Sequence, residues 1–531
     1  MSSDATTLRL RDGPLAGAAA ADSPERVRAR TRAKARREAW IGAGALATLL
    51  ACSLLFVVIA ADRPSLFSAT THTGFFPGWM AGPLGGLWPG LTRSATVLKC
   101  VFTGAMIAMY VSYLLALVYA PARLAARWTI ATVVGVHAIF FLAPPMALTD
   151  IFNYVNYGRM EVVHHLNPYT TYPVLEPHGD PSYLLSNWHQ LLSPYGPLFT
   201  LLTFALVPLG VAASFWAIKA VLVAASLGTV LLVWKCAQML DLDPVKAIVL
   251  VGLNPIVLVW GLGGDHNDFL MVLSIVLGFY LLLRARAART PSGAASDETG
   301  APFGDAPAMA VASTRELGWM WPLSAAELGA GAAFVAATAL KASGGVLIPI
   351  VLAALLRTPR RLIQVLLGMV AAGAVLGLAS LVAFGLHIPD LSTQSRLVTN
   401  ISIPNLLGLA LGGGGETETL HRLLSVVLVL SVLGCCVLAS RRREAIAPSG
   451  WATVALLVTL GWVLPWYVLW LLPLAALSRS RRLRTTALVL GAYLIVAWAP
   501  ASGLLWSAIG FQPAKTPLGR LHQRYVKELL N

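Results

Sequence analysis

The sequence predicts an all-α polytopic membrane protein with about 11–14 transmembrane helices, and three observations lead to this fold class. Of the 531 residues, 57% are hydrophobic and 12% are charged, a balance that suits lipid rather than water. The apolar residues gather in runs of the length that a helix needs to cross a bilayer. The formal net charge of +15 comes from short basic clusters between these runs, as the positive-inside rule describes. We therefore expect no nucleic-acid partner.

The first 39 residues are interpreted as a disordered, basic cytoplasmic tail, because an Ala-rich start leads into a basic run. The apolar segment 40–61 follows. A cleaved signal peptide is the alternative, but this run is about 20 residues long, enough to span, and lies far from the N-terminus. Further spans are expected at 97–119 and 127–148. Three crossings from a cytoplasmic tail place the next segment on the outer face.

Residues 149–195 form a loop that is too long for a simple connector and is expected to carry function. Asp150 opens this loop directly after an apolar run. An ionisable group in such a place commonly marks a substrate path or a catalytic cavity. A helix cap for a segment starting at Ile151 is the structural alternative, and the two roles are compatible. The other candidate residues either bind substrate or anchor the loop at the headgroup level; they are Tyr154, Tyr157, Arg159, His164, His165 and Tyr195.

A second polar motif, the break at 263–268, interrupts another apolar run. Basic clusters after the runs 268–283 and 343–356 should be cytoplasmic, which places the break on the outer face with Asp150. Two motifs on the same face must be separated by an even number of crossings. This holds for Asp150 and the break only if segment 196–209, about 14 residues long, dips into the membrane without spanning it.

The polar residues of this break are costly in lipid unless they line a hydrated cavity. The candidates are Asp265, His266, Asn267 and Asp268. Three uses remain open for them: hydrogen bonds to sugar hydroxyls, a divalent metal held by the two aspartates and the histidine, and capping of a helix end.

Residues 290–318 are rich in Ala, Gly, Pro and Ser and are interpreted as a flexible cytoplasmic linker. The linker joins an N-terminal transmembrane catalytic module, 40–289, to a C-terminal transmembrane module, 319–510, and a basic tail follows at 511–531. Spans of the second module are expected near 322–340, 343–357, 362–384, 421–439, 450–464, 467–477 and 485–500.

Two cations of the second module, Lys341 and Arg396, are expected on the outer side facing Asp150, where they could pair with a phosphate. Snorkelling to the headgroups is the alternative for Lys341. Trp466 and Tyr467 are expected on the same side as candidates for sugar contacts.

The strings DIFNYVNYGRM, NPYTTYP, SPYGPL, GGDHNDFLMV and LPWYVLW together resemble the polyprenyl-phosphomannose-dependent alpha-1,6-mannopyranosyltransferases of lipomannan assembly. These enzymes belong to the GT-C class of integral membrane glycosyltransferases, and the resemblance covers roughly residues 40–500. It implies a GT-C helical bundle whose first large outer loop contains short interfacial helices and supplies a catalytic carboxylate, here Asp150. The loop has a lone Asp where metal-dependent oligosaccharyltransferases have an Asp-x-Asp pair, so no metal or other cofactor is expected.

The resemblance also implies a reaction: inverting transfer of mannose from polyprenyl phosphate mannose to a lipid-linked mannan or glycolipid, at the outer face of the plasma membrane. The carboxylate would take the proton of the acceptor hydroxyl while cations offset the charge on the leaving phosphate. Two alternatives are an arabinofuranosyltransferase that uses polyprenyl phosphate arabinose, and a transporter or flippase for a lipid-linked sugar. The large aromatic outer loop and the absence of visible inverted repeats argue against the transporter.

Overall fold

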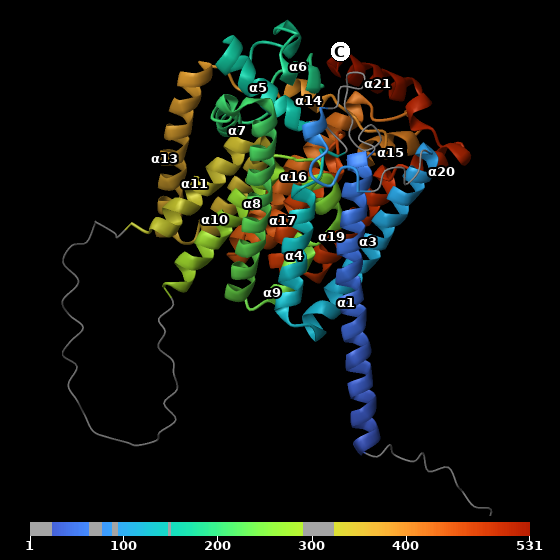
Figure 1. Cartoon of the computed structure of the whole chain (residues 1–531). Helices are drawn as coiled ribbons and strands as arrows, with labels where there is room; N and C mark the ends of the chain where they lie inside the picture. Colours follow the sequence, from blue (N-terminus) through green and yellow to red (C-terminus); the bar gives the residue numbers. More distant parts are fainter. Residues whose placement is uncertain (1–23, 63–76, 88–93, 147–149, 290–322, 531) are drawn as a thin grey trace, which may run out of the picture.

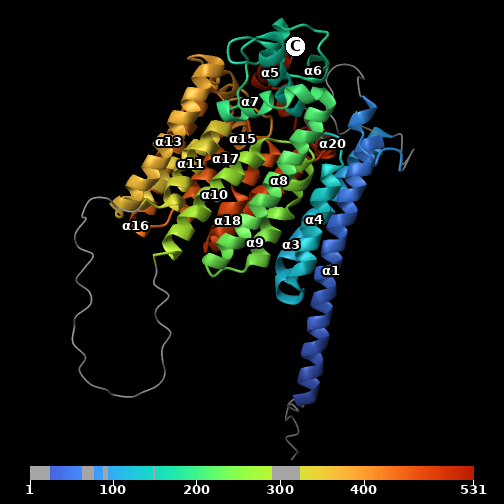
Figure 2. The same cartoon turned by 60° about the vertical axis from the view of Figure 1, so that its left-hand side comes forward.

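The computed structural model describes residues 24–62, 77–87, 94–146, 150–289 and 323–530, which form helices joined by turns and loops, without a strand. Tall helices run side by side through most of the molecule (Figures 1 and 2). Short helices gather at one end of this bundle, and the described residues that flank the segment 290–322 lie at the other (Figure 1). The all-α membrane fold expected from the composition is confirmed.

The first half begins with three helices that pack on one another, α1, α3 and α4. Their bounds are Pro24–Asp62, Ala95–Arg123 and Ala126–Phe141. Residues 24–39 were expected to be disordered, but they form the first part of α1. The alternating Arg, Ala, Lys and Glu of this stretch are good helix formers, so the apolar helix extends into a basic one. The expected disorder of residues 1–23 falls outside the described residues.

The outer loop contains short helical segments, as expected. They are α5 (Asp150–His164), η2 (Pro173–Leu175) and α6 (Pro181–Leu185), and α7 (Pro197–Phe204) and η3 (Val207–Leu209) follow in segment 196–209. Segment 196–209 is therefore no separate spanning helix, because α7 has eight residues and a rise of about 12 Å. After η3 the chain continues into α8 (Gly210–Met239).

The polar break lies between α9 (Pro244–Gly252) and α10 (Asp268–Ala287). Before the break, η4 (Val257–Leu262) is wound as a π-helix. Within the break itself, Asp265 has a positive φ of 55°, which is uncommon for a residue with a Cβ atom. π-helical turns are frequent at functional sites, and this one presents the polar residues 265–268 to the interior of the bundle.

The second half contains the remaining helices. They are α11 (Ala325–Leu340), η5 (Ala342–Leu347), α12 (Ile348–Leu355), α13 (Pro359–Phe384), α14 (Ser392–Ser395), α15 (Ile403–Ala410), α16 (Glu418–Arg442), α17 (Ile446–Thr459), η6 (Pro465–Trp470), α18 (Leu472–Leu477), α19 (Arg481–Trp498), α20 (Ser502–Ala508), η7 (Pro513–Lys515) and α21 (Pro517–Leu530). The expected basic tail therefore ends in a helix, α21. The two halves pack through α10 against α11.

Six helices in the described part of the chain are long and apolar enough to cross a membrane, or seven if the bent pair α19 and α20 is one span. They are α1, α3, α8 together with α7, α10, α13 and α16. Five expected spans correspond to shorter apolar helices, near 126–141, 325–340, 342–355, 446–459 and 465–477. The expected total of crossings therefore stays a prediction.

Candidate active site

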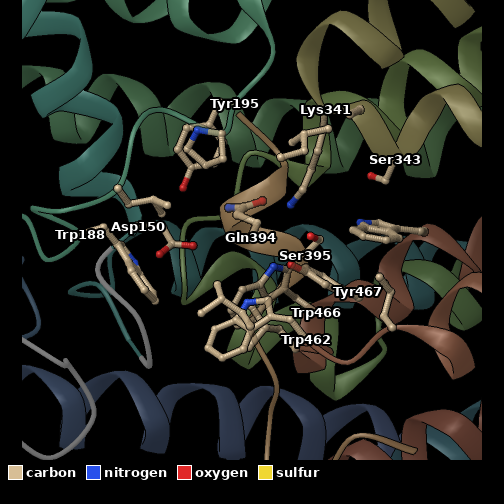
Figure 3. A pocket seen from close by; sticks show the side chains of 18 of the residues that line it. Asp150, Trp188, Tyr195, Lys341, Ser343, Gln394, Ser395, Trp462, Trp466 and Tyr467 are labelled. Carbon is tan, nitrogen blue, oxygen red and sulfur yellow. The ribbon is translucent and has the colours of Figure 1, made fainter. Parts of the chain in front are cut away.

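Asp150 lines a cavity of about 260 Å³ at the end of the bundle that carries the short helices. Six segments that are distant in sequence form its wall: the start of α5, the end of the outer loop, the turn after α11, α14, the end of α17 and η6. Asp150 and Lys341 enter the cavity from different sides (Figure 3). The cavity thus combines a carboxylate from the first half of the chain with a cation from the second.

Asp150 is the first residue of α5, and its side chain is 16% exposed. One of its oxygens, Oδ2, lies 3.5 Å from Nδ1 of His266. The His266 ring in turn stacks on Trp466, with ring centres 3.5 Å apart and planes 9° from parallel. The polar break therefore supplies the carboxylate with a neighbour, an outcome that the sequence alone left open.

Lys341 is the C-cap of α11, and its ammonium points inward instead of snorkelling to the headgroups. Nζ donates to both carboxylate oxygens of Asp268, at 2.9 Å each. Asp268 also accepts a hydrogen bond of 2.6 Å from Nε1 of Trp470. The ammonium lies 5.1 Å from the ring centre of Tyr467, a distance at which cation–π attraction contributes. The side chain of Lys341 remains 21% exposed, so a ligand in the cavity can reach it.

Aromatic side chains form much of the remaining wall: Tyr157, Trp188, Tyr195, Trp462, Trp466, Tyr467 and Trp470. Such rings offer flat apolar surface together with polar edges. Nε1 of Trp466 is buried and has no hydrogen-bond partner among the described residues. Buried donors are normally satisfied, so this indole suits a hydroxyl group of a ligand. Gln394, Ser395 and Ser343 add polar groups to the wall (Figure 3).

Arg159 and His164 do not reach the cavity. Arg159 donates to both oxygens of Asp180 at 2.8–3.1 Å, and Nε2 of His164 lies 2.9 Å from the same carboxylate. Burial would raise the pKa of Asp180, but the hydrogen bonds from Arg159, the Ser182 backbone and His164 hold this pKa well below its usual range. These residues therefore fasten α5 to α6, and neither Arg159 nor His164 belongs to the cavity wall.

A second buried carboxylate supports the same loop. Burial raises the pKa of Glu176 to about 8, although the hydrogen bond from Asn156 lowers it. Glu176 is therefore largely protonated near neutral pH, which suits its burial at 3% exposure.

The neighbours of His266 point in different directions. Asp265 binds Nζ of Lys219 at 2.9 Å inside the bundle, whereas Asp268 binds Lys341. Asp265, His266 and Asp268 therefore form no common ligand set. Among the described residues, no group of three His, Cys, Asp or Glu side chains could hold a metal ion.

The remaining candidates do not belong to the cavity wall. The Tyr154 hydroxyl accepts the backbone N–H of Asn267 at 3.2 Å and so joins the outer loop to the polar break. The Asn267 amide is buried without a partner among the described residues. Arg396 is exposed beyond α14, and His165 takes a positive φ of 54° just after α5.

Several wall residues could not be identified from the sequence alone. Trp462 and Trp470 are spaced four residues from Trp466 on either side, a weak signal within an aromatic segment. No pattern in the sequence marks the polar wall residues Gln394, Ser395 and Ser343, because isolated polar residues near a span are common.

Two family profiles match the chain. The N-terminal domain of the alpha-(1->6)-mannopyranosyltransferase family matches residues 64–357, and the MptB C-terminal domain matches residues 400–512. The first match includes Asp150, His266 and Lys341, and the second includes Trp466. No solved structure matches the chain significantly.

Similar proteins include two from Mycobacterium tuberculosis and one from Mycolicibacterium smegmatis. An alpha-(1->6)-mannopyranosyltransferase of Mycobacterium tuberculosis is 28% identical over 66% of this chain and 65% of its own length. The alpha-(1->6)-mannopyranosyltransferase A of the same organism is 26% identical over 68% of each chain. A probable alpha-(1->6)-mannopyranosyltransferase of Mycolicibacterium smegmatis is 27% identical over 63% of this chain and 62% of its own. The matched region thus spans a little under two thirds of the first relative.

Proposed function

Because this chain belongs to the alpha-(1->6)-mannopyranosyltransferase family, we propose that it is a membrane hexosyltransferase that adds mannose in alpha-1,6 linkage. The observation that carries the proposal is the cavity in which Asp150 and Lys341 meet. A transferase of this kind needs a base for the acceptor hydroxyl and a positive partner for the leaving group. The cavity provides one of each.

The reaction proposed is a single displacement. The acceptor oxygen attacks the anomeric carbon of the donor while Asp150 takes the hydroxyl proton. The bond from that carbon to the phosphate oxygen breaks, and the electron pair leaves with the phosphate. Attack from the face opposite the leaving group inverts the configuration, as in single-displacement glycosidases.

The donor proposed is polyprenyl phosphate mannose. Lys341 supports this choice, because its ammonium is at the cavity wall and can exchange Asp268 for a phosphate oxygen. The aromatic wall suits the apolar face of a hexose. The acceptor proposed is a lipid-linked mannan or glycolipid.

The location proposed is the outer face of the plasma membrane. The cavity lies at the end of the bundle opposite the basic start of α1 (Figure 1). Basic segments favour the cytoplasmic side, so the opposite end is the outer one.

The test is an assay of purified protein with an Asp150→Asn variant. We expect donor binding to persist and turnover to fall by about two or more orders of magnitude, the range typical of acid-base catalysis. Asp241→Asn is the matched control, because Asp241 is exposed between α8 and α9 at a positive φ that Asn tolerates. Near-normal turnover of Asp150→Asn would refute the assignment. Parallel assays with polyprenyl phosphate arabinose decide whether mannose or arabinose is transferred. If the wild-type protein transfers neither sugar, a transporter is favoured.

A further inference from the structure

We propose that His266 is a positioning residue that holds one oxygen of Asp150, so that the other oxygen faces the acceptor hydroxyl. The inference rests on the proposed function of Asp150. It gives the polar break between α9 and α10 a specific task, which is to orient the base without touching the sugar.

The His266 ring is held in one orientation. His266 is 1% exposed, and one face of the ring lies 3.5 Å from the Trp466 ring, almost parallel to it. At the Nε2 edge the chain leaves little space, since a Cβ atom added at Gly264 would lie 2.5 Å from Nε2. The ring can therefore neither slide nor turn easily.

The Nδ1 edge of this ring faces Asp150. Nδ1 lies 3.5 Å from Oδ2, which is long for a hydrogen bond. Neither ring nitrogen has a hydrogen-bond partner among the described residues, although buried polar atoms rarely remain unsatisfied. Catalytic hydrogen bonds are often long without substrate and shorten in the complex. The tautomer with its proton on Nδ1 would donate to Oδ2 after a small movement.

Two other roles for His266, sugar contact and metal binding, fit the structure less well. Direct sugar contact would need a ring nitrogen at the cavity surface, yet His266 is absent from the wall, whereas Trp466 and Asp150 on either side of it belong to the wall. Metal binding would need neighbouring ligands, and Asp265 and Asp268 are engaged by Lys219 and Lys341. Orientation of Asp150 is the role that uses both contacts of the ring, the stacking on Trp466 and the approach of Nδ1 to Oδ2 of Asp150.

During transfer, Oδ2 of Asp150 would keep its hydrogen bond from His266, and Oδ1 would take the proton of the acceptor hydroxyl. His266 gains and loses no proton in this scheme. Its contribution is geometric, because a base held in one orientation loses less freedom in the transition state.

The experiment compares two variants of the full-length protein. His266→Phe keeps a ring to stack on Trp466 but has no nitrogen, whereas His266→Asn keeps an N–H near the position of Nδ1. We expect His266→Phe to lower kcat about 10- to 100-fold, with the Kd for polyprenyl phosphate mannose within about twofold of wild type. His266→Asn should recover part of the lost kcat. Size-exclusion profiles and thermal unfolding establish that each variant is folded.

Two outcomes would overturn the inference: wild-type kcat in His266→Phe, or a parallel loss of donor affinity and kcat, which indicates sugar binding or a structural role. In the Asp150→Asn background, His266→Phe should have little further effect, because residues that act as a unit are not additive. If Asp150→Asn is active, the proposed function fails. If Asp150→Asn is inactive and His266→Phe is normal, only the present inference fails.

Discussion

At the scale of single residues, Lys341 connects the fold and the site. Its ammonium neutralises Asp268, which is 1% exposed, while its own side chain stays partly open to the cavity. In the proposed reaction, the phosphate of the donor would compete with Asp268 for the N–H groups of Lys341. When the phosphate departs, Lys341 would bind Asp268 again, so Asp268 would help to release the leaving group.

We predict that Lys341→Ala raises the Kd for polyprenyl phosphate mannose about 10- to 100-fold, since a hydrogen bond to a charged group contributes about 1.5–3 kcal/mol. Ligand titration of purified protein measures this change. The single variant leaves the buried carboxylate of Asp268 without a cation, so the double variant Lys341→Ala/Asp268→Asn, which removes this charge, is compared with it. Arg422→Ala, which alters a cation 75% exposed at the start of α16, should have no effect. An undiminished affinity in the double variant would exclude Lys341 as the phosphate partner.

We also predict that a chelator leaves the turnover of the purified protein unchanged.

The sequence predicted part of this site for a physical reason. A charge next to hydrocarbon needs a partner or water, which drew attention to Asp150, Lys341 and the polar break. The partner itself depends on tertiary packing. Asp180 lies 21 residues from Arg159, and Lys219 lies 46 residues from Asp265, so no local pattern links them. Arg159 and Asp265 therefore looked like ligand-binding residues, although ion pairs within the protein engage both.

At the scale of elements, the C-terminal helix α21 joins two loops that form the cavity wall. The backbone N–H of Gln190 donates to the carbonyl of Leu529 at 3.0 Å, and the Tyr525 hydroxyl donates to the carbonyl of Thr393 at 3.3 Å. Gln190 lies between wall residues Trp188 and Leu191, and Thr393 precedes wall residues Gln394 and Ser395. From the sequence, α21 was recognised only as a stretch with basic residues. Its packing could not be predicted, because α21 contacts loops from both halves of the chain.

We predict that Leu529→Ala lowers turnover several-fold and exposes α21 to protease, because Leu529 is 7% exposed and truncation of a buried leucine costs about 2–5 kcal/mol. Limited proteolysis and a transfer assay measure the two effects. Leu521→Ala is the control on the same helix, since Leu521 is 55% exposed. Equal behaviour of the two variants would show that docking of α21 does not matter for the cavity.

At the scale of the whole molecule, charges hold the two halves together at the end opposite the cavity. The buried Glu327 of α11 binds Arg289, after α10, at 2.6 Å and Arg361 of α13 at 2.7 Å. Arg361 also donates to the carbonyl of Leu282. This cluster joins residues on both sides of segment 290–322, so the halves are fixed to each other by side chains as well as by chain connectivity.

We predict that the two ends of the bundle face opposite sides of the membrane. Single cysteines at Pro181 in α6 and at Gly293, which lies outside the described residues, should label from opposite sides with an impermeant thiol reagent, in a background without the five native cysteines. Labelling of intact cells and of inverted vesicles separates the two sides. Reaction of both positions from the same side would contradict the orientation inferred from the basic clusters.

The wall of the cavity runs from Asp150 to Trp470 along the chain, which has a consequence for synthesis on the ribosome. At about 5–20 residues per second, tens of seconds pass between the appearance of the carboxylate and that of the last indole. Throughout this interval the nascent chain carries Asp150 without the complete cavity around it. If the cavity holds the donor as we propose, a chain released early would contain the carboxylate but could not bind lipid-linked sugar.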